Sequence, residues 1–200
     1  MARPVAKDYG TKRRLILDRA AQLFADEGFD RTSVSRVALA CEISKANVYH
    51  YYGSKDEILF DILDAYLSGL RDGIFALQTT LTHVTAQDRF SATITKILLD
   101  YQGMDHEHRL QTTVLNHLPP DQQKILLGYQ RELVHLMSRL IRDVEPVVFE
   151  NDPAKLRATT MSVFGMLNWF YMWKPDATGK DRRDYAAHIS RLCSGGFAGL

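Results

Sequence analysis

The chain has 200 residues, of which 46% are hydrophobic and 24% charged, and its formal net charge is +1. This composition is ordinary for a globular protein with one large domain, or with a small domain joined to a medium one. Its apolar runs are far below the ~20 residues needed to cross a bilayer, its charged N-terminus does not resemble a signal peptide, and two cysteines are too few for a disulfide framework. We therefore expect a reduced cytoplasmic protein with no membrane partner.

The first helix is expected over about residues 11–27, after a basic arm (residues 1–10) that we expect to be flexible. Gly28 follows the helix at the position where a left-handed C-terminal residue is favoured. The apolar residues of one helical face recur at the required spacing: Ile16, Ala20, Leu23 and Phe24.

Two short helices are predicted next, over about 33–40 and 45–51. We expect Thr32 or Ser33 to cap the first of them and Ser44 the second, because hydroxyl side chains cap helix N-termini. The residues between the helices are few enough for a tight turn. Two short helices joined in this way and supported by a third helix form a helix-turn-helix unit, which places its second helix in the DNA major groove.

A long fourth helix is predicted to begin after Ser54, with Glu57 completing a capping box. The remaining sequence predicts five further helices, over about 85–101, 106–118, 120–145, 152–174 and 181–193. We therefore expect an all-α protein of about nine helices. Residues 1–55 would form a helix-turn-helix DNA-binding domain, and residues 56–200 a larger domain for effector binding and dimerisation.

Charge and aromatic residues support a DNA contact at the N-terminal end. Residues 1–55 carry 10 Lys/Arg and 6 Asp/Glu, a net charge of +4, and the remainder carries 15 and 18, a net charge of −3. The run 49–52 places three tyrosines and a histidine together, and such groups can donate hydrogen bonds to phosphate oxygens. We expect Tyr49 and His50 to contact phosphate, and the alternative for Tyr51 and Tyr52 is that they anchor the DNA-binding domain.

The segment GFDRTSVSRVALACEISKANVYHYYGSKDEIL (residues 28–59) resembles the DNA-binding signature of the tetracycline-repressor (TetR) family. The resemblance implies phosphate contacts for Ser33, Arg36 and Lys55, with Ser35 near a base edge. It also implies that Lys45, Ala46 and Asn47 open the recognition helix, where lysine can donate to guanine and asparagine can pair with adenine. The alternative for the two lysines is plain solvation.

One residue departs from the family pattern. The turn between the two short helices usually carries glycine, and this chain has Glu42 there. If its backbone is left-handed, the side chain costs roughly 1 kcal/mol. We expect the carboxylate to point away from the DNA, because it would repel phosphate.

The aromatic segment MSVFGMLNWFYMWKP (residues 161–175) is the strongest feature of the larger domain. Its apolar residues lie all round the helix, which predicts burial on several sides. The alternative role for these residues is core and dimer interface. The family resemblance implies a two-fold dimer through the last two helices, which fits a palindromic operator.

The same segment loosely resembles the branch of the family that responds to acyl-CoA thioesters of phenylacetate, fatty acids and steroids. This resemblance implies an acyl-CoA effector, with phenylacetyl-CoA favoured. We expect an apolar slot with an amide inside it and a basic mouth for the nucleotide phosphates. The candidate slot residues are Tyr129, Met137, Phe164, Asn168 and Tyr171, and the basic candidates include Arg109 and Lys174. The alternative is an efflux regulator that binds an apolar or cationic drug, which the absence of acids from residues 161–173 disfavours.

The sequence gives no reason to expect an enzyme, a cofactor or a metal site. It contains no GxSxG, P-loop, GxGxxG or HExxH motif. His106 and His108 would point about 200° apart on a helix, so they would not chelate a metal from one face. The expected partners are double-stranded operator DNA, a small effector and a second copy of the chain.

Overall fold

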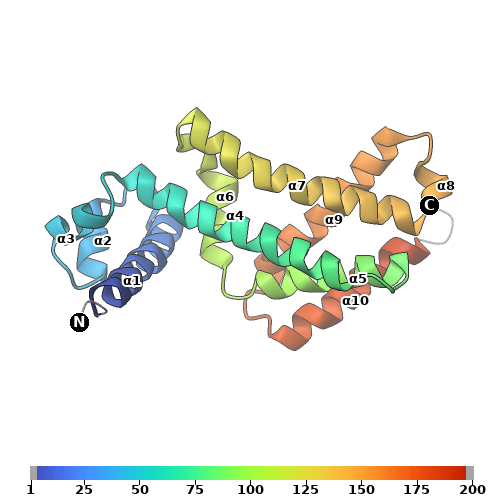
Figure 1. Cartoon of the computed structure of the whole chain (residues 1–200), viewed down its shortest axis with the longest axis horizontal. Coiled ribbons are helices and arrows are strands. Elements are labelled where there is room, and N and C mark those ends of the chain that lie inside the picture. The colour runs from blue at the N-terminus through green and yellow to red at the C-terminus, as the bar shows by residue number, and fades with distance from the viewer. Residues whose placement is uncertain (1–3, 197–200) are drawn as a thin grey trace. The chain divides into compact units, whose positions relative to one another are not determined.

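The computed structural model describes residues 4–196, with side chains from residue 9 onward (Figure 1). These residues form ten α-helices and one short 3₁₀ helix, with no strand among them, so the all-α prediction is confirmed. In chain order the helices are α1 (Pro4–Glu27), α2 (Val34–Ala40), α3 (Lys45–Tyr51), α4 (Lys55–Thr80), α5 (Ala86–Asp100), α6 (Asp105–Thr113), η1 (Leu115–His117), α7 (Pro120–Val144), α8 (Pro146–Phe149), α9 (Pro153–Trp173) and α10 (Gly179–Gly195).

The predicted caps determine where the short helices begin. The Ser33 hydroxyl accepts a hydrogen bond from the Arg36 backbone N–H, and the Ser44 hydroxyl accepts one from the Asn47 N–H, each at 3.1 Å. At α4, Ser54 accepts from the backbone N–H of Glu57 as predicted. The Glu57 carboxylate reaches back one residue further than in the usual capping box and accepts from the Gly53 N–H at 2.8 Å.

Two helix boundaries differ from the prediction, and one short helix was not predicted. Helix α1 begins at Pro4, so the part of the expected flexible arm that the structure describes is helical, and residues 1–3 lie outside the described residues. Proline is tolerated at the first helical position, because a backbone N–H there would have no acceptor within the helix. The helix predicted to end near 118 breaks at Thr113 and continues as η1. Helix α8 was missed, because four residues are too few to show a helical period.

The chain divides into two compact units. The first comprises residues 4–67 and 104–126, and the second comprises residues 68–103 and 127–196. The functional boundary expected between residues 55 and 56 stays a prediction.

In the first unit, α1 packs against α2 and α6, and α2 packs against α3. The residues that form its centre have no more than 1% of their surface exposed: Ile16, Ala20, Phe24, Val37, Val48, Ile58 and Leu59. Three of these lie on the predicted apolar face of α1. The fourth predicted member of that face, Leu23, is only half-buried.

In the second unit, α10 lies along α5, and α9 contacts both α5 and α8. Its centre includes Phe90, Ile94, Leu167, Phe170, Ala186 and Ile189. One charged side chain is buried with them. Arg182 is 2% exposed, and its guanidinium donates to the Leu98 carbonyl at 3.1 Å.

Candidate nucleic-acid interface and effector cavity

The turn between α2 and α3 has the left-handed backbone that was considered for Glu42. Glu42 has φ = 55°, in the left-handed region. Its N–H donates to the Leu39 carbonyl at 3.1 Å, and the N–H of Ile43 donates to the Ala38 carbonyl at 3.0 Å. These two bonds are the Schellman motif, which normally places glycine at the left-handed residue. A glutamate therefore occupies a glycine position between the two helices of the helix-turn-helix unit.

Helix α3 buries one residue and exposes most of the others. Val48 is fully buried, which fixes the helix on the core of the first unit. Asn47 is half-buried, and the other predicted DNA-contacting residues of this helix, Lys45, Ala46, Tyr49 and His50, are exposed. The Lys45 ammonium lies 5.6 Å from the centre of the Tyr49 ring, which holds the two side chains together.

Helix α2 presents Ser33, Ser35 and Arg36 as exposed residues. The Arg36 guanidinium binds the Glu27 carboxylate at the end of α1, with Nη2 to Oε1 at 2.7 Å and Nε to Oε1 at 3.2 Å. The hydrogen bond from Arg36 lowers the pKa of Glu27 and is accompanied by a raised pKa of Arg36. A candidate phosphate-binding side chain thus has an internal partner.

Lys55 also has internal partners, at the start of α4. Its ammonium donates to the Phe29 carbonyl at 2.6 Å and lies 4.2 Å from the centre of the Phe29 ring. Lys55 therefore fastens the segment that joins α1 to α2. Sequence reasoning missed this role, because it depends on a contact across 26 residues of chain. Its phosphate contact stays a prediction.

The aromatic run at residues 49–52 divides between two environments. The Tyr51 ring packs on Tyr9 of α1, with ring centres 4.6 Å apart, and His50 meets Tyr51 edge to face. Tyr52 is 4% exposed, and burial raises the pKa of its hydroxyl. The two latter tyrosines thus have the surroundings expected of anchoring residues, while Tyr49 faces solvent.

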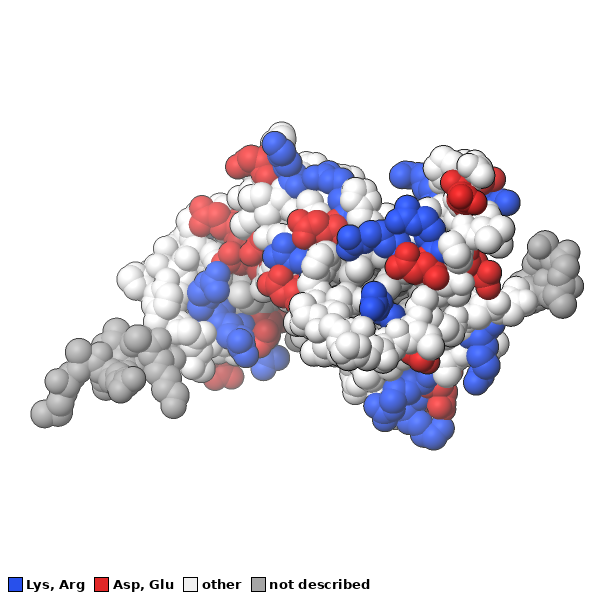
Figure 2. All heavy atoms as spheres, turned by 45° about the vertical axis from the view of Figure 1, so that its right-hand side comes forward, with Lys and Arg blue, Asp and Glu red and all other residues white. Residues whose placement is uncertain are grey.

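Charged side chains of both signs are intermixed over the face of the molecule shown in Figure 2. Residues 1–55 contain more basic than acidic residues, but on the face shown these residues do not form a continuous basic surface. None of the helices within residues 4–196 combines the length and apolar character needed to span a bilayer.

The predicted effector residues are spread over both units. Asn168 accepts a hydrogen bond from the Tyr101 hydroxyl at 2.9 Å. Tyr129 is half-buried beneath the Arg71 guanidinium, 4.7 Å from its ring centre. Tyr171 is also half-buried, and Met137 and Phe164 are buried.

The two basic candidates have acidic neighbours. Lys174 lies 3.7 Å from Asp181. Arg109 belongs to the first unit, where it contacts Asp26 at 3.3 Å. None of the seven predicted effector residues lines the cavity described next.

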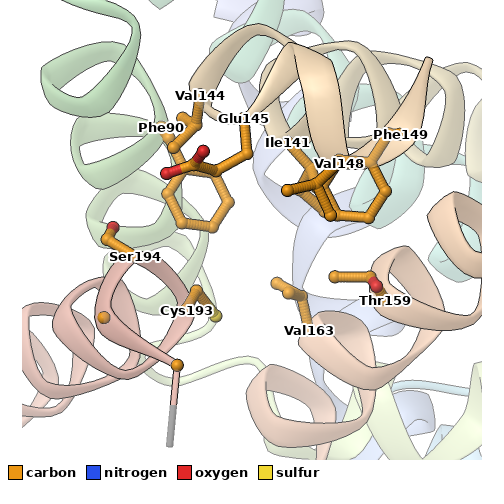
Figure 3. A pocket seen from close by; sticks show the side chains of 12 residues that line it. Phe90, Ile141, Val144, Glu145, Val148, Phe149, Thr159, Val163, Cys193 and Ser194 are labelled. Carbon is orange, nitrogen blue, oxygen red and sulfur yellow. The ribbon is translucent and has the colours of Figure 1, made fainter. Parts of the chain in front are cut away.

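The second unit contains an apolar cavity of about 240 Å³ that the sequence did not indicate (Figure 3). Figure 3 shows Ile141, Val148 and Phe149 on one side, facing Thr159 and Val163 of α9, with Cys193 of α10 nearby. Phe90 and Val144 complete the apolar wall, and Glu145 is the one carboxylate among the described lining residues. Burial raises the pKa of the Cys193 thiol. Because the wall is assembled from five helices, no local sequence pattern could reveal it.

The prediction that residues 161–173 are buried on several sides is wrong for the single chain. Val163, Phe164, Leu167 and Phe170 are buried, but an apolar stripe on α9 is exposed. The stripe contains Met161, Trp169, Met172 and Trp173, which are 48%, 62%, 52% and 54% exposed. Two exposed tryptophans one helical turn apart are unusual for a solvated surface and are typical of an interface.

Known proteins share this arrangement. A profile described as bacterial regulatory proteins of the tetR family matches residues 16–62, and one described as a tetracyclin repressor-like C-terminal domain matches residues 83–197. A TetR-family transcriptional regulator from Bordetella parapertussis is 32% identical, with a TM-score of 0.84 over 94% of this chain and 96% of its own.

Two further proteins are similar in a more limited way. The first has the same fold at low sequence identity, and the second matches only a short segment of the sequence. AibR, solved with isovaleryl coenzyme A and operator DNA, has a TM-score of 0.74 at 22% identity, covering 90% of this chain and 97% of AibR. The transcriptional regulator HbdR of Aromatoleum sp. is 34% identical over 59 residues, or 28% of this chain. The match spans only 26% of HbdR.

Proposed function

Because the chain belongs to the TetR family of bacterial transcriptional regulators, we propose that it is a repressor that binds a palindromic operator as a dimer and leaves it when a small effector binds. The observation that carries the proposal is the exposed face of α3. This face presents Lys45, Ala46 and Tyr49 from a helix whose orientation is fixed by the buried Val48. A helix held in this way can enter the major groove with its first turn.

The DNA contacts divide into two kinds. Lys45 and Asn47 read base edges, and Tyr49, His50, Arg36 and Ser33 bind phosphates. We expect Lys45→Ala to lose about 1–3 kcal/mol of discrimination between operator and scrambled duplexes. Tyr49→Phe should weaken binding to both duplexes alike, because phosphate contacts carry no sequence information. Titrations of both duplexes over a salt series test this. An equal loss on operator and scrambled DNA for Lys45→Ala would show that the lysine does not read bases.

The dimer in this proposal forms through α9 and α10, with the exposed stripe of α9 at its centre. Trp169→Glu should give a folded monomer, because Trp169 has few contacts to lose within its own chain and a charge would be buried at the interface. Ile125→Glu, at an exposed apolar position of α7, distinguishes loss of the α9 stripe from the general effect of a charge at an exposed apolar site. Sedimentation velocity gives the oligomeric state, and a Trp169→Glu dimer as stable as the wild-type dimer would rule out this interface.

The proposed effector is an acyl-CoA thioester, with phenylacetyl-CoA favoured. The solved complex of AibR with isovaleryl coenzyme A and operator DNA provides a precedent in a protein of the same fold. The apolar cavity of the second unit, about 240 Å³, is smaller than the 300–1,000 Å³ typical of whole-ligand pockets. It is therefore suited to an acyl group with the nucleotide outside. The slot around Asn168 is the second candidate for the same group.

Two substitutions distinguish these acyl sites. Val148→Trp fills the mouth of the cavity from a half-exposed position, and Asn168→Leu removes the amide of the slot. Calorimetry with phenylacetyl-CoA, isovaleryl-CoA, free CoA and phenylacetate then shows which variant loses thioester binding. Free acids should bind more weakly, because they would bring an unpaired carboxylate into an apolar site. Binding of a cationic drug with no response to any thioester would instead favour the efflux-regulator alternative.

Release from DNA follows from a shift between two populations. An effector that prefers the state with poor operator affinity weakens DNA binding by the same factor by which DNA weakens effector binding. Effector affinity measured with and without operator DNA should therefore change in parallel with operator affinity.

A further inference from the structure

A second cavity lies in the first unit, bounded by α1, α4 and α6, and none of the sites described above uses it. Its volume is about 640 Å³, which is within the range of small-molecule sites. Much of its wall is apolar and is formed by Leu17, Ile62, Ala65, Tyr66 and Met104. Because α1 packs on both α2 and α6, a molecule in this cavity would touch the helix that supports the helix-turn-helix unit.

One polar group in the wall is buried without a partner. Oε2 of Glu107, in the first turn of α6, is shielded from solvent and accepts no hydrogen bond from the described residues. Burial raises the pKa of this carboxyl, a hydrogen bond from its own backbone N–H lowers it by less, and the nearby carboxylates of Asp18 and Asp105 raise it further. A buried carboxylate oxygen without a donor is energetically costly. Glu107 is among the residues that line the cavity, so an N–H donor bound there would lie next to this carboxylate.

The charges around the cavity favour a cationic ligand. Arg13 is already paired with Asp61. Arg14 and Asp18 lie one turn apart on α1 and have opposite charges. His106, which offsets part of the charge of Glu107, is itself 3.9 Å from Asp26. With Arg13 paired to Asp61, and Arg14 and Asp18 offsetting each other in formal charge, Glu107 leaves the described wall with a net negative charge.

Tyr66 supplies a second feature that attracts cations. Tyr66 is among the lining residues, and its hydroxyl is hydrogen-bonded to Nδ1 of His108 at 2.9 Å. This bond holds the ring in place as part of the wall. Ammonium groups are attracted to aromatic faces, and the attraction is larger where water is excluded. The wall thus combines a buried acid with an aromatic ring, the pair of features that the segment 161–173 does not offer.

We propose that the cavity between α1, α4 and α6 binds a small aliphatic amine, whose ammonium group donates to Glu107 and whose carbon chain lies against Leu17, Ile62 and Tyr66. The amine is distinct from the thioester effector, and its site does not depend on the acyl cavity.

The test uses the full-length protein with putrescine and spermidine as probes, measured by calorimetry and by thermal unfolding. Both amines should bind and raise the unfolding temperature. Butane-1,4-diol, which matches putrescine in chain length without its charge, should not bind. Choline should bind more weakly than putrescine, because its quaternary nitrogen has no N–H to donate.

Glu107→Gln is the decisive variant, and Glu150→Gln, an exposed acid in the second unit, is its matched control. We expect Glu107→Gln to weaken amine binding by about tenfold or more, the usual effect of losing a charge-assisted hydrogen bond, and Glu150→Gln to leave it unchanged. Both variants should still bind the thioester. Loss of amine binding can therefore be distinguished from loss of thioester binding, and each proposal can fail without the other. Undiminished amine binding by Glu107→Gln, equal binding of the diol, or no binding of either amine at millimolar concentration would each overturn the proposal.

Discussion

Replacing Glu42 with glycine should stabilise the protein, although it removes a whole side chain. Glu42 closes a Schellman motif at φ = 55°, and a side chain in this region costs roughly 1–2 kcal/mol relative to glycine. Glycine also makes the unfolded chain more flexible, which costs about 0.4–1 kcal/mol. The net gain is then about 0.5–1 kcal/mol, or roughly 1–4 °C in Tm for a chain of this size.

Two control variants separate the backbone effect from the charge. Glu42→Gln removes the charge and keeps the strain, and Glu42→Asn introduces a residue that tolerates left-handed backbone. Thermal unfolding of the four proteins should rank glycine as the most stable, then asparagine, with glutamine close to the wild type. If Glu42→Gly is no more stable than Glu42→Gln, the strain argument is wrong. Any gain in stability of both variants over the wild type would then come from removal of the charge.

Three other outcomes are expected. Glu27→Gln should raise affinity for operator and scrambled DNA alike, because it frees Arg36 from its internal partner; unchanged affinity in fluorescence anisotropy would mean that Arg36 does not contact DNA. Arg182→Met should stay within about 1.5 kcal/mol of wild-type stability, whereas Arg182→Ala should lose about 2–5 kcal/mol by leaving a void; denaturant titrations compare the two. The pKa of Glu107 is raised from its ordinary value of 4.5, so the folded protein keeps the carboxyl proton to a higher pH than the unfolded chain does. Glu107 therefore makes the free energy of unfolding fall as pH rises from 4.5 to the raised pKa. Glu107→Gln should lack this pH-dependent contribution to stability. Identical pH profiles of Tm for the variant and the wild type would refute the prediction.

Local sequence was sufficient to predict the helix-turn-helix unit. Capping acts over three or four residues, so Ser44 could be identified as a cap, and the first cap could be narrowed to Thr32 or Ser33, without tertiary information. That Glu42 is left-handed was settled only by the structure. The periodic apolar face of α1 was predicted from local sequence. The interruption at Thr113 and the four-residue α8 were not, because short elements owe their stability to contacts outside themselves.

The internal partners of the predicted DNA-contacting residues were decided by tertiary structure. Arg36 meets Glu27 and Lys55 meets Phe29 only when α1, α2 and α4 are packed together. The chemistry of an arginine or lysine permits both a phosphate contact and an internal one, and sequence spacing does not distinguish them.

The sequence by itself determined the fold class, the family and the position of the recognition helix, because each of these depends on patterns within a few turns of chain. Only the tertiary structure revealed the two cavities, the buried Glu107 and the exposed stripe of α9. A cavity wall collects side chains from helices far apart in the sequence, as Phe90, Ile141 and Val163 illustrate. Whether an apolar residue such as Trp169 faces the core or a partner depends on which faces the neighbouring helices already cover, and hydrophobicity alone carries no information about that choice.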